Sequence, residues 1–367
     1  MKIVIFGLTI SSSWGNGHAT LWRGLCKHLV RSGHAIVFFE RDVPYYAGAR
    51  DMFELPGGQL ELFSTWEDVR AKAHDHILGA DAAIVTSYCP DAIVATQLIL
   101  DQSRARAVFY DLDTPVTLSK LHAGEAVPYI GPDGLAGFDL VLSFTGGPRV
   151  SDEFRRKLGA RNVQPLYGHV DADVHRPVPP QPHYRAALSY LGTYSEDRQL
   201  ALETLFVEPA RARQDLRFLI GGAQYPDDFP WSPNIHFVRH LPPSEHAPFF
   251  ASSRLTLNVT RRAMAEMGWC PSGRLFEAAA CGAPLLSDGW AGIEAFFTPG
   301  DEILIAHDKC DTLAALDMKD SELLRIAGRA RERTMEQHSS GKRAGELIAL
   351  LEQTARRGAL QAEAEEA

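Results

Sequence analysis

Residues 2–33 read KIVIFGLTISSSWGNGHATLWRGLCKHLVRSG, and this stretch contains the pattern that decides the fold. The run KIVIFG is short, apolar and rich in β-branched residues, as buried parallel strands are. After a polar loop, apolar residues recur at spacings of three and four, which predicts a helix that ends before Gly33. A strand followed at once by a helix is the repeating unit of parallel α/β sheets.

The same unit repeats on both sides of a proline-rich stretch. Residues 171–184, DADVHRPVPPQPHY, contain four prolines and neither a helical nor a strand period, which predicts a linker. Further strands are predicted at 35–40, 82–88, 106–113 and 139–144, and beyond the linker at 188–194, 216–222, 235–240, 254–260, 283–288 and 302–306.

The length of 367 residues exceeds what one hydrophobic core usually organises. We therefore predict an α/β protein with two Rossmann-like domains that face each other across a cleft. The first domain is expected at 1–170 and the second at 185–338, followed by a C-terminal helix and acidic tail at 339–367. Open parallel sheets bind ligands beyond the carboxyl ends of their strands, so the loops after strands are candidate sites.

Composition narrows the class of partner and compartment. The formal net charge is -9 and no block of Lys and Arg occurs, so nucleic acid is not expected as a partner. The five cysteines are scattered without a CxxC pair, which favours neither disulfides nor a zinc site. No leader-like or membrane-spanning apolar run is visible, so we expect a cytoplasmic protein without a transmembrane segment.

The most informative stretch is PSGRLFEAAACGAPLLSDGWAGIEAFF at 271–297. It predicts a helix capped by Ser272 and stopped by Gly282. The N-terminus of such a helix, together with Arg274, suits a pyrophosphate, because backbone N–H groups and a guanidinium fork bind anions. Glu277 follows one turn later and suits ribose hydroxyls. An anion site beside a carboxylate is what a nucleotide-sugar requires.

This stretch resembles the signature of CgeB-like (spore-maturation-type) glycosyltransferases, which have the GT-B fold and are related to family 4 glycosyltransferases. Its core LFEAAACGAP is similar to the E-A-hydrophobic-A-C-G-x-P element with which such enzymes bind the donor nucleotide. Segments 11–20, 188–199, 216–226 and 257–282 also resemble this family. The resemblance implies a hexosyltransferase with an acceptor-binding first domain, a second domain that binds a nucleoside-diphosphate sugar, and no metal or other cofactor.

The resemblance also implies a donor site in the second domain. Arg198 is similar in position to a basic residue of the family, with a solvated first-turn residue as the alternative. Many family 4 enzymes hold a second carboxylate eight positions before the one that matches Glu277, where this chain has Trp269, so a retaining or inverting outcome stays open. The predicted donor-binding residues are Gly192, Thr193, Arg198, Ser272, Gly273, Arg274 and Glu277.

The first domain contains candidates for the catalytic base. His18 follows the first strand, and inverting GT-B enzymes often place a His or Asp of this domain beside the acceptor hydroxyl; packing or loop capping is the alternative. Asp111 and Asp113 are the next candidates. They also form a D-x-D pair that suits Mg²⁺, but we favour a helix cap by Asp113 and acceptor orientation, and predict no metal.

Acceptor contacts are predicted for Trp14 and Asn16 in the first loop and for Tyr45 and Tyr46 after the second strand, because flat rings suit sugars. The acceptor itself stays open between a saccharide, a protein, a lipid-linked carrier and a small metabolite.

Three other functions compete with a transferase. A dehydrogenase needs G-x-G-x-x-G after the first strand, a spacing that Gly7, Gly15 and Gly17 do not give, although Glu40 ends the second strand as that motif requires. A GT-B sugar-nucleotide epimerase or hydrolase would share fold and donor. A non-catalytic nucleotide-sugar-binding protein would need no base.

Overall fold

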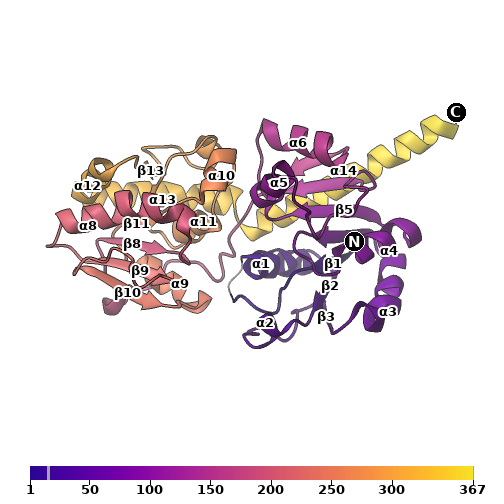
Figure 1. Ribbon diagram of the computed structural model, residues 1–367, viewed down its shortest axis with the longest axis horizontal. Helices are drawn as coiled ribbons and strands as arrows, with labels where there is room; N and C mark the ends of the chain where they lie inside the picture. Colours follow the sequence, from indigo (N-terminus) through magenta and orange to yellow (C-terminus); the bar gives the residue numbers. More distant parts are fainter. Residues whose placement is uncertain (15–16, 367) are drawn as a thin grey trace. The chain divides into compact units, whose positions relative to one another are not determined.

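The computed structural model describes residues 1–14 and 17–366, with side chains up to Arg356 (Figure 1). The chain divides into two compact units. The first comprises Met1–Tyr167 and Ser340–Ala367, and the second comprises Gly168–Ser339. The proline-rich segment predicted as a linker is thus grouped with the second unit, where the backbone N–H of Gln181 donates to Oγ of Ser252 at 2.7 Å.

The first unit is built on a seven-stranded parallel sheet of order β3-β2-β1-β4-β5-β6-β7. The central strand β1 is buried between its neighbours, and Ile3, Val4 and Ile5 are fully inaccessible. The strands are β1 Lys2–Gly7, β2 Ala35–Arg41, β3 Gln59–Phe63, β4 Ala82–Thr86, β5 Arg106–Asp111, β6 Leu140–Ser143 and β7 Val163–Pro165. The helices are α1 His18–Arg31, α2 Pro44–Ala47, α3 Trp66–Leu78, α4 Ala92–Gln102, α5 Thr114–His122, α6 Pro148–Leu158 and α14 Ser340–Glu366.

The second unit repeats this plan with a six-stranded parallel sheet of order β10-β9-β8-β11-β12-β13. Its strands are β8 Leu188–Leu191, β9 Phe218–Gly222, β10 Ile235–Arg239, β11 Thr256–Asn258, β12 Leu285–Ser287 and β13 Leu304–Ile305. Its helices are α7 Gln199–Leu202, α8 Glu208–Ala212, α9 Pro243–Ala251, α10 Arg262–Met267, α11 Gly273–Ala280, α12 Lys309–Asp317 and α13 Asp320–Gln337, and a π-helical turn, Glu203–Val207, joins α7 to α8.

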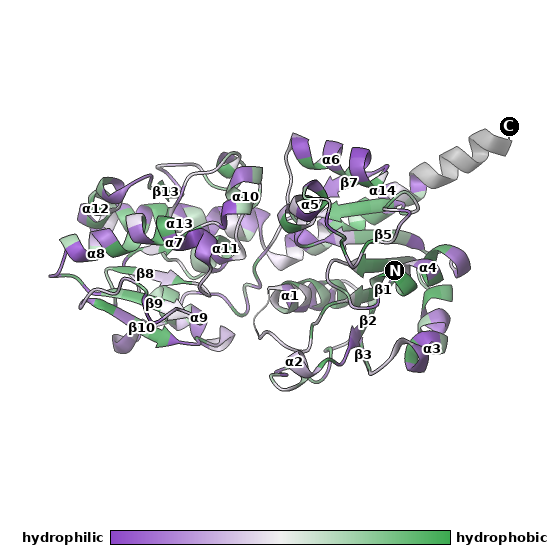
Figure 2. Cartoon of the chain, viewed as in Figure 1, coloured by the Kyte–Doolittle hydropathy of each residue, from purple (hydrophilic) through white to green (hydrophobic). Residues whose placement is uncertain are grey.

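The strands of the sheets are more hydrophobic than the helices that cover them. Figure 2 shows the hydrophobic colour over the strands β1 and β5 and the hydrophilic colour over much of α6, which begins PRVSDEFRRK. Continuous apolar strands are needed because helices cover both faces of a doubly wound parallel sheet. Among the described residues, no helix combines the length and apolar character that crossing a membrane requires.

Each sheet contains one point where the order of strands reverses. β1 lies between β2 and β4, and β8 lies between β9 and β11. Loops that leave adjacent strands in opposite directions at such a point form the usual ligand site of open α/β sheets. The loops after β1 and β8 therefore stand where a ligand is expected in each unit.

The predicted fold class is confirmed, and each predicted strand is present: β1 has the predicted bounds, β2 extends one residue further, and the others are shorter than predicted. Two strands were missed, β3 with sequence QLELF and β7 with sequence VQP. Both are edge strands of the first sheet. An edge strand needs less apolar surface than a central one, so its sequence carries a weaker signal.

The last helix returns to the first unit. α14 packs against α1 and β5, with Ala344, Leu347 and Leu351 buried (Figure 1). The first unit is therefore assembled from both ends of the chain.

Candidate functional site

The N-terminus of α11 has the predicted geometry. Ser272 is the N-cap in extended conformation, and its Oγ accepts a hydrogen bond from the backbone N–H of Arg274 at 3.3 Å. The helix ends at Ala280, and Gly282 follows with φ +77°, the left-handed conformation that favours glycine. A side chain built on Gly273 would meet no atom within 4 Å, so the first turn is open to an approaching group.

Glu277 lies one turn further along α11 and is buried. Its Oε2 contacts Nη1 of Arg274, Nδ1 of His246 at 3.5 Å and Nε2 of His175 at 3.7 Å. Burial alone would raise the pKa of this carboxyl, but the charge of Arg274 and the two imidazoles outweigh it and hold the pKa of Glu277 well below its usual range. Glu277 is therefore a buried carboxylate that stays ionised.

The two histidines beside Glu277 are harder to protonate than exposed imidazoles. Burial first, and the charge of Arg274 second for His246, lower the pKa of both imidazoles, although Glu277 opposes the shift. Nη1 of Arg274 lies 3.1 Å from Nδ1 of His246. A guanidinium can only donate, so Nδ1 of His246 is the acceptor in this contact.

Sequence reasoning missed both histidines as partners of Glu277. His175 lies in the proline-rich segment before β8, and His246 lies in α9. No spacing in the sequence links residues that far apart, and only the packing of α9 against α11 brings them together.

Two imidazoles and one carboxylate are also a ligand set for a divalent cation. The ligand atoms of His175, His246 and Glu277 lie within 4.8 Å of one another. However, the guanidinium of Arg274 contacts two of the three residues and already supplies the positive charge. A metal ion would have to displace Arg274 from Glu277.

The loop after β8 contains the other predicted donor residues. A side chain on Gly192 would lie 2.6 Å from Oη of Tyr190, so only glycine fits there. Arg198 ends a 3₁₀ turn, Glu196–Arg198, and its Nη2 donates to the carbonyl of Thr193 at 2.6 Å. Arg198 thus braces the loop rather than pointing freely into solvent.

Trp269 occupies the position where many family 4 enzymes hold a second carboxylate. It has φ +45°, a strained conformation for a bulky residue. A side chain on Gly292 would come within 2.5 Å of the indole, so the ring packs directly against the loop after β12. Trp269 therefore fills space where a carboxylate would offer hydrogen bonds.

In the first unit, His18 is held by a carboxylate. Its Nε2 lies 2.9 Å from Oδ2 of Asp113, which also accepts a hydrogen bond from Oγ of Ser87 at 3.0 Å. Nδ1 of His18 is buried and, among the described residues, has no hydrogen-bond partner. The arrangement resembles a base with its orienting acid.

Asp111, at the end of β5, has a different environment. It is fully buried; its Oδ1 accepts from the backbone N–H of Asp113 at 2.9 Å, and its Oδ2 is a buried oxygen without a partner among the described residues. Burial, followed by the charge of Asp113, raises the pKa of Asp111 to about 7. The expected side-chain cap by Asp113 is wrong: Asp113 is the N-cap residue of α5, but its carboxylate binds His18 and Ser87 instead.

Glu40, the residue that favoured a dehydrogenase in the sequence, forms hydrogen bonds within the first unit. Its carboxylate accepts four hydrogen bonds from the loop after β1: Oγ1 of Thr9 at 2.9 Å, N–H of Ile10 at 2.7 Å, and N–H and Oγ of Ser11 at 2.9 and 2.6 Å. A carboxylate that fixes a loop in this way is not available for a ribose. The dehydrogenase interpretation therefore loses its support.

The next residues of the loop are also fixed by protein groups. Oγ of Ser12 donates to the carbonyl of Ala49 at 2.9 Å, and Oγ of Ser13 donates to Asp51 at 2.6 Å. Burial opposes ionisation of Asp51, but hydrogen bonds from Arg23 and Ser13 lower its pKa to about 2. These hydroxyls shape the path of the loop.

Of the predicted acceptor residues, Trp14 and Tyr45 are exposed and Tyr46 is half-buried. Trp14 is 39% exposed and Tyr45 is 59% exposed, and the rings of Tyr45 and Tyr46 meet edge to face at 5.0 Å in α2. Asn16 lies outside the described residues.

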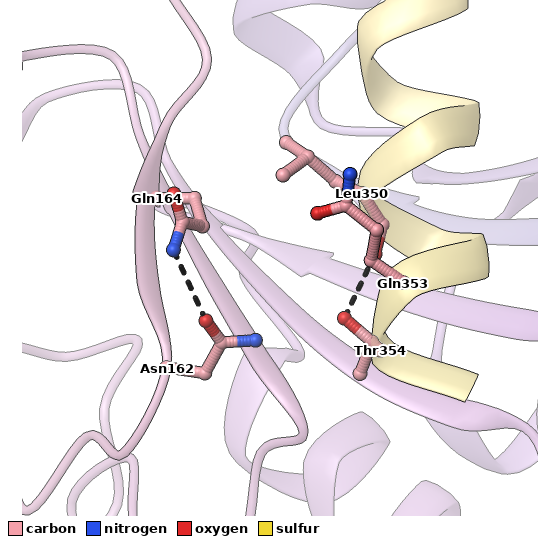
Figure 3. A pocket seen from close by; sticks show the side chains of 5 residues that line it. All are labelled: Asn162, Gln164, Leu350, Gln353 and Thr354. Atoms are coloured by element: carbon pink, nitrogen blue, oxygen red, sulfur yellow. Dashed lines mark hydrogen bonds between the residues drawn. The ribbon is translucent and has the colours of Figure 1, made fainter. Parts of the chain in front are cut away.

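One small cavity of the first unit is ruled out as a ligand site by its size. Figure 3 shows Asn162 and Gln164 on one side and Leu350, Gln353 and Thr354 of α14 on the other. The space between them is about 10 Å³, which is room for at most one water molecule.

Comparisons with known proteins agree with this geometry. Residues 198–349 match the sequence model of a family described as glycosyl transferase-like, a segment that includes Arg198 and the whole of α11. No curated protein matches the sequence.

Solved structures match over nearly the whole chain. Sucrose-phosphate synthase from Thermosynechococcus elongatus matches with a TM-score of 0.69 at 15% identity, covering 97% of this chain and 99% of that one. HepE from Anabaena, in complex with UDP and glucose, matches with a TM-score of 0.65 at 12% identity, covering 96% and 100%. BGT from phage T4, in complex with its UDP-glucose substrate, matches with a TM-score of 0.62 at 12% identity, covering 96% and 99%. The chain therefore has the GT-B fold, and its residues 198–349 match the model of a glycosyl transferase-like family.

Proposed function

We propose that this protein is a glycosyltransferase that moves a sugar from a nucleoside-diphosphate sugar to a hydroxyl group of an acceptor. The observation that carries the proposal is the buried, ionised Glu277 bound to Arg274 at the start of α11. This pair lies inside the segment that matches the glycosyl transferase-like family. The UDP and UDP-glucose complexes of HepE and BGT, which share the fold, support a donor of this class.

The donor site is assigned to the second unit. Nη1 of Arg274 holds Glu277, while Nε and Nη2 have no partner among the residues that the structure describes and remain for a diphosphate. The contacts of Glu277 all involve Oε2, which leaves Oε1 for a ribose hydroxyl. Ser272 and Gly273 open the helix whose N–H groups favour an anion.

The loop after β8 completes this assignment, because it lies at the point where the strand order of the second sheet reverses. Gly192 and Thr193 present backbone, and Arg198 braces them. As the glycosidic bond breaks, the leaving nucleoside diphosphate gains negative charge, which Arg274 and the N-terminus of α11 stabilise. Such a mechanism needs no metal ion, and this is the mechanism that we propose; a CgeB-like subtype is part of the same proposal.

The base is assigned to His18 of the first unit. Nε2–H points to Asp113, so the unpartnered Nδ1 is the atom that accepts a proton. The acceptor hydroxyl gives its proton to Nδ1 while its oxygen attacks the anomeric carbon, and the bond to the diphosphate breaks with its electron pair leaving on phosphate oxygen. Asp113 stabilises the imidazolium that forms. His18 is preferred to Asp111 as the base because Asp113 orients its imidazole; Oδ2 of Asp111, like Nδ1 of His18, is buried and has no partner among the described residues.

The test is incubation of the protein with a panel of nucleoside-diphosphate sugars, with and without candidate acceptors, followed by measurement of released nucleoside diphosphate. We expect thermal stabilisation by one nucleoside diphosphate and slow donor hydrolysis that a suitable acceptor accelerates. Stabilisation without release would favour a binding protein, and conversion of the donor sugar without an acceptor would favour an epimerase. Neither stabilisation nor release with any donor would reject the proposal.

A further inference from the structure

A hollow of about 480 Å³ lies on the second unit, lined by residues of β10 and of the segment between β9 and β10. We call it the aromatic pocket. Its volume falls within the range of small-molecule sites. It is lined by Gln224, Tyr225, Pro226, Asp227, Trp231, Ile235, Phe237 and Arg239.

Strand register places the aromatic pocket on a defined face of the sheet. Ile235 of β10 pairs with Phe218 of β9, and Phe237 pairs with Ile220, so these side chains share one face. A side chain on Gly221, which would point to the other face, would touch Phe249 of α9. The pocket is therefore on the face opposite to α9, and α9 is the helix that packs against α11. None of its lining residues is assigned to the donor, and it adjoins the proposed donor loop through the hydrogen bond from Tyr225 to the carbonyl of Gly192.

The wall of the pocket is a fixed aromatic surface. The ring of Phe237 lies 5.2 Å from that of Tyr225 and 5.4 Å from that of Trp231, and Phe237 is 38% exposed. Oη of Tyr225 donates to the carbonyl of Gly192 at 3.2 Å, which holds the ring in place. A rigid aromatic surface binds at low entropic cost, because its side chains are already ordered.

The rim of the pocket offers polar groups that no protein partner uses. Among the described residues, the side chains of Gln224, Asp227 and Arg239 form no hydrogen bond or ion pair, and the indole N–H of Trp231 is likewise without a partner. Gln224 has φ +65°, an unusual backbone conformation outside glycine. The opposite charges of Arg239 and Asp227 give the rim no net charge. The rim therefore suits an uncharged ligand with many hydroxyls better than a phosphate.

From this combination we infer that the aromatic pocket is a saccharide-binding site. The C–H face of a pyranose ring packs against Tyr225, Trp231 and Phe237. The planar groups of Gln224, Asp227 and Arg239 bridge its hydroxyls. This inference does not depend on transferase activity, because a saccharide would bind here with no donor present.

The test uses the full chain labelled with 5-fluorotryptophan, titrated with a panel of neutral oligosaccharides and followed by fluorine NMR. The sequence has six tryptophans, and Trp231→Phe identifies the signal of Trp231. We expect one class of oligosaccharide to shift this signal with saturation, and Arg239→Gln to weaken binding about tenfold through loss of a charged hydrogen bond. Arg239 is exposed, so this variant keeps the fold.

Two control variants lie in the same unit but outside the pocket: Arg185→Gln, which is exposed, and Leu200→Ala, which is 78% exposed. Both should bind like the parent protein. No shift of Trp231 with any saccharide at millimolar concentration overturns the inference, as does a shift that Arg239→Gln leaves unchanged. A shift caused by a nucleoside diphosphate or by a peptide, and not by saccharides, assigns the pocket to another ligand. Binding of nucleoside diphosphates to the parent protein, measured by thermal shift, reports separately on the proposed function.

Discussion

At the scale of single residues, Glu277 shows how a buried charge becomes useful. It stays ionised only because Arg274, His246 and His175 surround one of its oxygens. We predict that Glu277→Gln, which keeps the shape, weakens binding of the nucleoside diphosphate by about 1–3 kcal/mol through loss of charged hydrogen bonds. Isothermal titration calorimetry measures the affinity of each variant for the nucleoside diphosphate. The matched control is Glu266→Gln in α10, where Glu266 forms an exposed ion pair with Arg262; equal affinities of the two variants would contradict the role of Glu277.

His18 and Asp113 belong to the chemical step rather than to donor binding. We predict that His18→Ala lowers kcat about 100-fold or more, in the range of general-base catalysis, and leaves nucleotide affinity unchanged. Asp113→Asn should lower kcat less and shift the pH dependence of the rate, because the carboxylate stabilises the imidazolium. His74→Ala is the control, since His74 in α3 is half-buried and lies beside the exposed Asp75. Lost nucleotide affinity with unchanged kcat in His18→Ala would show that the base is elsewhere.

Asp111 makes stability depend on pH. Its pKa is about 7 in the folded protein, above the ordinary 3.8, so the folded state binds more protons between these values. The stability of the first unit should therefore fall as pH rises from about 4 to 7, by roughly 4 kcal/mol at most, and then level off. Asp111→Asn should remove this part of the dependence. Urea unfolding at pH 5 and pH 8 measures it, and equal pH dependence in parent and variant would refute the argument.

At the scale of elements, α11 depends on its cap. Ser272→Ala removes the acceptor for the N–H of Arg274 and should lower the free energy of unfolding by about 1 kcal/mol. Ser272→Thr retains an oxygen at the same place and should restore most of it. Urea unfolding of the parent and the two variants measures these free energies. If Ser272→Thr lowered the free energy of unfolding as much as Ser272→Ala, the N-cap hydrogen bond would not be the cause of the loss.

The edge strands show where element prediction fails. β3 places Glu61 within QLELF, and β7 has only three residues and ends in Pro165. Central strands such as β1 are recognised because both faces and both edges are buried, which leaves little room for polar residues. An edge strand is defined by the neighbour that it pairs with, and that neighbour lies elsewhere in the sequence.

At the scale of the whole molecule, α14 belongs to the first unit although it follows α13 of the second. Leu347 and Leu351 are fully buried in α14. We predict that Leu347→Ala and Leu351→Ala each lower the stability of the first unit by about 2–5 kcal/mol. Hydrogen-exchange mass spectrometry should show lost protection in β1 and β5, with β8 and β9 unchanged. Glu352→Ala, on the exposed side of α14, should change neither; uniform loss in both units would contradict this division of the chain.

By itself, the sequence determined the two parallel α/β sheets, the capped helix α11 and the presence of Arg274 and Glu277 in its first turns. These features depend on local periodicity, a cap and a short motif, so neighbouring residues are enough to reveal them.

Only the tertiary structure decided how the candidate groups pair. It joined His18 to Asp113, enclosed Glu277 between His175 and His246, gave Glu40 to the loop after β1, and formed the aromatic pocket on β10. Partners of this kind are 29 to 102 residues apart in the sequence. The physical reason is that the charge and hydrogen bonding of a buried side chain depend on what packs against it, and no local pattern records such neighbours.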